Sequence, residues 1–470
     1  MLTRRGFLLV GAGVGTAVVV PRALASGATA TTAAAAAVAD PFTRAMPVPP
    51  TLRPIASIAG TDIYRLALQP STVEVVPGLQ TEVLSYAPGF FGGPVIRARR
   101  DRPVALIMRN QLDEETNVHL HGGHVPAGSD GHPLDVIEPG AARLYRYPNR
   151  QAGATLWYHD HTHHLEADHV YRGAHGLYLV EDDDERRLRL PSGDYDVPIM
   201  LRDVKLDAAG ALVSGPPADR PTILANGVAQ PYFQVAARKY RFRLLNCSTT
   251  RLFQLSLDQG AMTQIGTDGG LLPAPVERAQ LAMAAGERVE IVVDFSAFPV
   301  GTQLVLTDPL AGPVLRFDVT RTAADRSQVP AALRPLPALA TPTVQRDVVF
   351  SMDTTQRPPV GLVNGKPYDP ERADFEITRG STETWRVSNG DATNYQHSFH
   401  LHLVQFRVLE RNGGAPTADD AGLKDTIQLP TGSTVTVQAT FSDYLGRYAF
   451  HCHMLDHSRV GMMAQMEIVP

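Results

Sequence analysis

The feature that most constrains the fold of this chain is an internal repeat, which links two strand-like segments at a nearly constant spacing. Gly140 and Gly432 each begin a copy, and they precede His159 and His451 by the same number of residues. A middle copy begins at Gly286 and is two residues longer. Self-similarity of this kind indicates repeated structural units. The 470 residues leave room for about three domains of roughly 150 residues each, so the sequence predicts three domains of similar build.

Strand-like segments recur along the chain, and long amphipathic helical patterns are scarce. The clearest segments are Val104–Arg109, Lys239–Leu245, Glu287–Phe295 and Thr434–Phe441. The 39 glycines and 37 prolines are typical of a turn-rich all-β protein. We therefore predict three consecutive β-sandwich domains and a Pro/Ala-rich linker. The predicted bounds are 45–182, 195–322 and 345–470 for the domains and 323–344 for the linker.

His-x-His pairs occur four times, and in a strand each pair places both imidazoles on one face. The pairs are His119/His121, His159/His161, His400/His402 and His451/His453. Two lie in the first predicted domain and two in the third, whereas the middle copy has Thr307 at the matching position. A single pair is easily a surface feature, but four in matched domains predict a metal cluster at an interface. Eight imidazoles could hold three copper ions with two or three ligands each.

Cys452 lies between His451 and His453 and would face the opposite side of the strand. His397 precedes His400 by three residues, so an extended strand turns it to that same side. His457 and Met462 follow after a turn. A cysteine, two histidines and a weak thioether are the ligands of an electron-transfer copper site. We expect the segment to join a one-electron site to the histidine cluster.

These motifs, in order and spacing, resemble a three-domain multicopper oxidase of the laccase type. The details are most similar to the branch of bacterial spore-coat laccase, bilirubin oxidase and phenoxazinone synthase, with Ala154–His161 as a strong match. The resemblance covers nearly the whole mature chain and implies cupredoxin-like Greek-key domains with four copper ions. It assigns type 1 copper to His397, Cys452 and His457 with axial Met462, type 2 copper to His119 and His400, and the paired type 3 coppers to His121, His159, His161, His402, His451 and His453.

The resemblance also implies an activity, that of an oxidoreductase acting on diphenols and related donors with oxygen as acceptor. A small aromatic reductant would give electrons to type 1 copper through the edge of His457. Cys452 would pass them to the cluster, where dioxygen is reduced to water. Asp130 matches the family's acidic residue near type 2 copper, with a proton or electrostatic role. Its alternative role is a turn-forming aspartate before Gly131.

The chain departs from the family pattern after the last type 1 histidine. The branch usually has a glutamate there for proton delivery, and this chain has Ser458 followed by Arg459. The direction of the Asp456 side chain is open. The histidine-rich stretch 162–169 is either an auxiliary metal or substrate site, or a helical turn with surface histidines. Cys247 is expected to be a small buried side chain.

Two other functions remain open alternatives. An exported copper-handling protein, metal-ion oxidase or redox partner would share the ligands but consume little oxygen with organic donors. The chain has no methionine-rich insert, which argues against a dedicated cuprous-ion oxidase. A cupredoxin scaffold that has lost copper requires missing ligands, and none is missing.

Residues 1–25 are typical of a twin-arginine export signal that is cleaved. Arg4 and Arg5 precede an apolar run shorter than the roughly 20 residues of a membrane span, which disfavours a retained anchor. The Ala- and Thr-rich composition of residues 26–44 predicts a flexible lead-in. We therefore expect a secreted or extracytoplasmic protein without stable membrane insertion. The net charge of -5 gives no sign of a nucleic-acid partner, and one chain can supply every ligand, so a monomer suffices.

Overall fold

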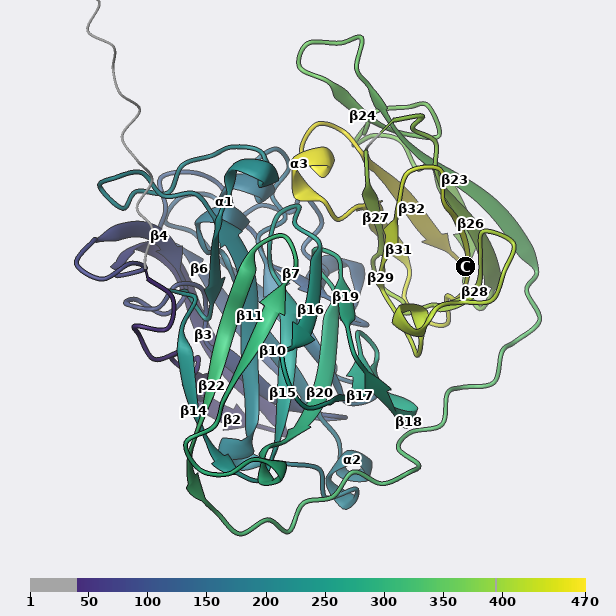
Figure 1. Cartoon of the computed structure of the whole chain (residues 1–470). Helices are drawn as coiled ribbons and strands as arrows, with labels where there is room; N and C mark the ends of the chain where they lie inside the picture. Colours follow the sequence, from purple (N-terminus) through teal and green to yellow (C-terminus); the bar gives the residue numbers. More distant parts are fainter. Residues whose placement is uncertain (1–39, 394) are drawn as a thin grey trace, which may run out of the picture. The chain divides into compact units, whose positions relative to one another are not determined.

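In the computed structural model, residues 40–393 and 395–470 are described, and they form six β-sheets (Figure 1). The α-helices of this part are short: α1 (Glu166–Arg172), α2 (Asp183–Arg187) and α3 (Leu455–Ser458). The predicted all-β class is therefore confirmed. None of these helices has the length and apolar character needed to cross a membrane. The predicted signal, residues 1–25, and residues 26–39 of the predicted lead-in lie outside the described residues.

Residues 51–181 form the first pair of sheets, which encloses one apolar core. Tyr64 and Leu66 from one sheet share this core with Leu156 and Tyr158 from the other. One sheet has the order β1 (Thr51–Leu52), β5 (Val95–Arg99), β10 (His175–Glu181), β9 (Ala154–His159) and β7 (His119–His121). The other has the order β2 (Ala56–Ile58), β3 (Thr61–Val73), β6 (Val104–Asn110) and β8 (Ala142–Tyr147), with β4 (Thr81–Ser85) paired to β3.

Residues 196–322 form the second pair, packed around Phe242, Ile291 and Phe317. The larger sheet has the order β13 (Val228–Ala229), β12 (Thr222–Ala225), β11 (Asp196–Val204), β15 (Lys239–Asn246), β20 (Arg288–Asp294), β17 (Met262–Thr267) and β18 (Gly270–Arg278). The smaller has the order β14 (Tyr232–Ala237), β22 (Gly312–Thr322), β21 (Gln303–Asp308), β16 (Phe253–Leu257) and β19 (Leu281–Met283).

Residues 344–469 form the third pair, packed around Trp385, Phe399 and Phe450. One sheet has the order β24 (Val360–Val363), β23 (Val344–Asp353), β26 (Thr382–Asn389), β30 (Thr434–Thr440) and β28 (Arg407–Arg411). The other has the order β25 (Phe375–Thr378), β32 (Met463–Val469), β31 (Gly446–Cys452), β27 (His397–Leu401) and β29 (Thr426–Leu429). Residues 323–343 contain neither helix nor strand. The four predicted strands are found as β6, β15, β20 and β30, while the exact domain bounds stay a prediction.

The internal repeat corresponds to one topological unit that occurs three times. The order β3-β6-β8 recurs as β11-β15-β20 and β23-β26-β30, and in each case the first two strands are parallel and the last two antiparallel. Each repeat copy runs from one sheet to the facing sheet, as β8 to β9, β20 to β21 and β30 to β31. Gly140, Gly286 and Gly432 all have φ between 70° and 89°. Glycine recurs there because this left-handed conformation is strained for other residues.

Candidate metal centre

The strand registers place histidines of the outer repeats opposite one another. His119 on β7 pairs with His159 on β9, and His400 on β27 pairs with His451 on β31. Paired residues project from the same face of a sheet, so each pair brings two imidazoles together. In the middle repeat the matching strands pair Ser256 with Thr307. These two hydroxyls contact each other at 3.2 Å, so the middle repeat has a hydroxyl pair where the outer repeats have histidines.

The opposite face of β27 and β31 carries a separate group. Cys452 pairs with Phe399 rather than with a histidine, and its Sγ lies 3.7 Å from Nδ1 of His397 and 3.7 Å from Nδ1 of His457. The two Nδ1 atoms are 3.1 Å apart. Met462 is fully buried and its backbone is hydrogen-bonded to Cys452 and His457. The strand alternation predicted from the sequence therefore places Cys452 and His397 on one face of these strands and His400 and His451 on the other.

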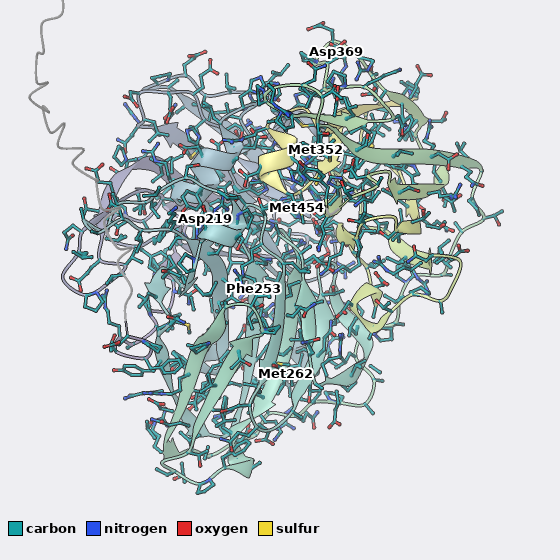
Figure 2. The ribbon with its side chains drawn as sticks, turned by 45° about the horizontal axis from the view of Figure 1, so that its top comes forward. Asp219, Phe253, Met262, Met352, Asp369 and Met454 are labelled. Atoms are coloured by element: carbon teal, nitrogen blue, oxygen red, sulfur yellow. The ribbon has the colours of Figure 1, made fainter. Side chains whose placement is uncertain are left out.

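The loop and turn after β31 complete this second group. Met454 precedes α3 (Figure 2), and α3 carries His457 at its third position. His397, Cys452 and Met462 are buried, whereas His457 is half-buried. The Nε2 atom of His397 donates to Asp391 at 2.8 Å, which leaves Nδ1 facing the sulfur. His457 is thus the member of the group that solvent reaches.

The eight remaining predicted ligands gather in three groups of facing ring nitrogens. Their members are His121, His159 and His453 in one, His161, His402 and His451 in the second, and His119 and His400 with His121 in the third. The Nε2 atoms of His161 and His451 are 3.0 Å apart, and those of His119 and His400 are 3.5 Å apart. Two imidazoles bound to one ion at about 2.0–2.1 Å place their nitrogens about 3–3.5 Å apart. The spacing therefore fits metal binding.

The chemistry of the donors also fits copper. Burial, reinforced by the neighbouring imidazoles, lowers the pKa of all eight histidines, so they are neutral and have a lone pair to donate. Ring nitrogens of His121, His159, His161 and His453 are buried without a hydrogen-bond partner. Burial raises the pKa of the Cys452 thiol to about 12, so its thiolate form requires a bound cation. Imidazole and thiolate sets of this composition suit copper.

Asp130, predicted to act near the cluster, is fully buried against two of these histidines. Its backbone carbonyl accepts from Nδ1 of His119 at 2.6 Å, and its Oδ2 accepts from Nδ1 of His402 at 2.8 Å. Burial raises the pKa of Asp130 well above its usual range. Acceptors of this kind fix the ring orientation and the tautomer of a ligating histidine. Asp130 also precedes Gly131, whose φ is 77°, so the turn and the histidine contacts coexist.

Asp425 has the same arrangement on the other side of the cluster, and the sequence reasoning missed it. Its backbone carbonyl accepts from Nδ1 of His400 at 2.8 Å, and its Oδ1 accepts from Nε2 of His121 at 2.9 Å. Asp130 lies in the first pair of sheets and Asp425 in the third. Each aspartate therefore holds one histidine from the first pair of sheets and one from the third. The aspartate stands just before β29 and outside any histidine motif, so no local pattern marks it.

A buried charge network joins Asp425 to the middle pair of sheets. Arg288 donates to both carboxyl oxygens of Asp425, at 2.7 and 2.5 Å. Asp268 accepts from Lys424 at 3.1 Å and lies 3.5 Å from Arg288, and Lys424 also pairs with Glu287 at 2.8 Å. All five side chains are buried. The part of the chain without metal-binding histidines therefore supports the cluster indirectly.

Asp456, whose direction the sequence left open, points to the middle pair of sheets. Its Oδ2 accepts from Arg220 at 3.1 Å and from Thr250 at 2.7 Å. The backbone N–H of Leu455 donates to Thr249 at 2.7 Å. The α3 turn is thus held by residues of the middle pair of sheets, and Asp456 is committed to this anchor.

The histidine-rich stretch 162–169 forms no metal-binding group among the described residues. His164 is exposed and His163 is half-buried. His169, on α1, is fully buried and lies between Asp160 at 3.1 Å and Glu114 at 2.9 Å. The predicted helical turn with surface histidines is therefore wrong for His169. Its imidazole is buried and contacts two carboxyl groups instead of water. Cys247 is buried as predicted, and both cysteines are free.

Comparison with known proteins identifies the family. Two family models described as multicopper oxidase match residues 67–185 and 340–470. The laccase of Bacillus subtilis is 34% identical, covering 91% of this chain and 98% of its own. The bilirubin oxidase of Albifimbria verrucaria is 34% identical, covering 90% of this chain and 80% of its own.

Solved structures agree with the sequence relatives. The crystal structure of laccase from Pediococcus acidilactici superposes with a TM-score of 0.84 at 29% identity, covering 92% of this chain and 96% of that chain. The predicted fold class of three consecutive cupredoxin-like β-sandwich domains is therefore confirmed. The histidine and cysteine groups, the repeated sandwiches and these relatives lead to one conclusion: the chain belongs to the multicopper oxidase family, whose members use copper and reduce dioxygen.

Proposed function

We propose that the chain is a laccase-type oxidase, which couples one-electron oxidation of phenols or aromatic amines to reduction of dioxygen to water. The observation that carries the proposal is the placement of Cys452. Its sulfur belongs to the group with His397 and His457, while its neighbours His451 and His453 belong to two groups of the histidine cluster. Two covalent paths therefore connect a site that takes single electrons with a site that can collect several.

Electrons would enter at the Cys452 group, and dioxygen would be reduced at the histidine cluster. Bound copper would supply one-electron transfer at the Cys452 group and dioxygen reduction at the histidine cluster, with four ions in total. His457 offers the solvent-reachable edge at which a donor can dock. The buried sulfur and strand keep water away from the electron path. Asp130 and Asp425 hold their four histidines in one tautomer, so the facing nitrogens stay available.

We further propose that the donor is a small aromatic molecule and that the active form is a monomer. One chain supplies all of the proposed ligands, from β7, β9, β27 and β31 with the turns that follow them. Residues 1–25 are proposed to direct export through a twin-arginine route, which keeps the copper ligands from competing with cytosolic thiols.

The test is reconstitution with copper followed by oxygen uptake across simple phenols, o-aminophenols, bilirubin and cuprous ion. We expect four copper ions per chain, an intense blue absorption band and oxygen uptake with at least one aromatic donor. Cys452→Ser should lose the blue band and turnover, whereas Cys247→Ser should keep both. A holoprotein that is blue but takes up oxygen only with cuprous ion would favour the metal-ion oxidase. Absence of uptake with every donor would favour a copper-handling or redox-partner protein.

A further inference from the structure

Glu166 is a buried carboxyl for which the family assignment gives no role. It is the first residue of α1 and its side chain is fully buried. Neither carboxyl oxygen has a hydrogen-bond partner. Burying an unpartnered carboxyl is unfavourable, so its retention there needs a reason.

The surroundings of Glu166 contain further polar atoms of the same kind. The neighbouring hydroxyl of Ser458, on α3, is fully buried and unpartnered. The hydroxyl of Tyr368 and Nδ1 of His163 are buried atoms without a partner as well. The rings of Tyr368 and His163 are 4.9 Å apart, and both residues are half-buried. Buried polar groups gathered in this way are commonly joined by ordered water.

This cluster lies where the first and third pairs of sheets meet. Ala167 and Val170 of α1 pack on Leu455 of α3, and the two helices are adjacent in Figure 1. The N–H of Glu166 donates to Thr162 at 2.9 Å, and Thr162 directly follows His161 of the histidine cluster. Glu166 therefore lies beside the chain segment that leads from His161 into α1, at the contact between α1 and α3.

The charge environment keeps a proton on this carboxyl. Burial, with a smaller contribution from the charge of Asp160, raises the pKa of Glu166 to about 8, although Ser458 and Arg459 act in the opposite direction. Burial, with a smaller contribution from Glu166, raises the pKa of Tyr368. On α1 itself, Asp168 is exposed and pairs with Arg172. At neutral pH Glu166 is thus a protonated acid inside the protein.

Asp160, the other buried acid near this segment, does not fit the same role. Its carboxyl accepts from Thr162 N–H at 2.7 Å and lies 3.1 Å from Nδ1 of His169. It also hydrogen-bonds the hydroxyl of Thr116. A carboxylate with this many donors is held in its ionised form, so it has no proton to give.

We propose that Glu166, with Ser458 and Tyr368, forms a proton relay that supplies the reduction of dioxygen. The inference rests on the proposed function. Each dioxygen takes up four electrons from the donor and four protons, and leaves as two waters. Glu166 gives a proton toward the cluster through ordered water and is reprotonated from solvent by way of Tyr368, so the carboxyl is regenerated.

Infrared titration tests the acid itself, independently of turnover. The wild-type protein should show a protonated carboxyl C=O band that disappears as pH rises through about 8, and Glu166→Gln should lack this band. Asp168→Asn, which removes an exposed acid from the same helix, should keep it. A wild-type protein whose Glu166 band is already absent at pH 6 would overturn the relay.

Reoxidation kinetics tests the role. Ferrocyanide is a suitable donor because its oxidation releases no proton. Glu166→Gln should be reduced by ferrocyanide without oxygen as fast as wild type, but its reoxidation by dioxygen should be slower by about a hundredfold, the low end of proton-transfer catalysis. Asp168→Asn should reoxidise at the wild-type rate. Wild-type reoxidation should also slow above pH 8.

A second variant covers the case in which Glu166→Gln does not fold. Glu166→Gln combined with Ser458→Glu returns a carboxyl to the same space and should restore fast reoxidation. Equal reoxidation rates for wild type and Glu166→Gln would overturn the relay while leaving the oxidase intact. A wild-type protein that consumes no oxygen would instead overturn the proposed function, and the relay with it.

Discussion

Individual side chains at the cluster act in pairs that mirror each other across the interface. Asp130 and Asp425 each use a backbone carbonyl for one histidine and a carboxyl oxygen for another. Neither aspartate is among the predicted ligands. Both fix which ring nitrogen of a histidine is free to bind.

Replacing Asp130 should therefore weaken the cluster without unfolding the chain. Asp130→Asn can still accept one hydrogen bond through its amide oxygen, but it replaces the carboxyl group beside His402 with an amide. Loss of such a partner lowers metal affinity or activity by about 10- to 100-fold. Copper content after dialysis and oxygen uptake measure the effect. Asp135→Asn, an acid at the surface paired with Arg143, is the control, and equal loss in both variants would contradict the prediction.

Glu166 should also make folding stability depend on pH. Its pKa is about 8 in the folded protein against an ordinary value of 4.5, so the folded chain binds the extra proton between these values. The stability that this group contributes is therefore present at low pH and falls as pH rises from about 4.5 to 8. Glu166→Gln should remove that loss, and its unfolding midpoint relative to wild type should rise between pH 5 and pH 9. A constant difference across this range would contradict the prediction.

Among the elements, α3 illustrates how a short turn is held by its neighbours. Four residues are too few for a helix to be stable alone. Contacts from α1 in the first pair of sheets and from Arg220 in the middle pair hold α3 in place. Arg220 donates to Asp456 and to Thr249, and its guanidinium lies 4.8 Å from the ring centre of Tyr171 on α1. Because His457 belongs to α3, this anchor determines where the solvent-reachable ligand sits.

Arg220→Met should loosen the turn and disturb the group around Cys452. Hydrogen bonds to charged groups contribute about 1.5–3 kcal/mol each, so we expect a loss of stability of that order. The blue band should broaden or shift and the reduction potential should change, while the copper content of the histidine cluster stays the same. Arg372→Met, which removes a surface pair with Asp374, serves as control. An unchanged blue band in Arg220→Met would count against the anchor.

For the whole molecule, the middle pair of sheets contributes support rather than ligands. Arg288 is fully buried and bridges Asp268 to Asp425. The hydroxyl pair Ser256 and Thr307 occupies the positions that histidines occupy in the outer repeats. The three repeats therefore share a topology while only the outer two retain donors for metal.

Arg288→Met should destabilise the entire protein. Removing one partner of a buried ion pair leaves an uncompensated charge at Asp425 and costs about 3–5 kcal/mol. Denaturant unfolding measures the loss, and copper affinity should fall with it because Asp425 holds His121 and His400. Arg187→Met, whose partner Asp184 lies on the exposed surface, should change little. Comparable stability of the two variants would show that the network is not needed.

Much of the fold and the ligand set followed from local pattern. Strand alternation determined that His397 and Cys452 share one face and His400 and His451 the other, because side chains in a strand alternate with a period of two. The repeated glycines predicted three similar units, since the same left-handed turn begins each copy. Strand faces and repeated turns can be predicted from the sequence because they depend only on residues that are close together in the chain.

Asp425, Arg288, Arg220 and Glu166 were not predicted, because their roles depend on which sheets face one another. Arg288 and Asp425 are 137 residues apart, and no periodicity relates them. Ser458, a departure from the family pattern by sequence, has the Glu166 carboxyl beside it only once α1 and α3 pack together. The sequence thus determined the donors and the strand faces that carry them. The tertiary structure decided which acids hold the donors and where a buried proton resides, because burial and charge pairing arise from contacts between distant segments.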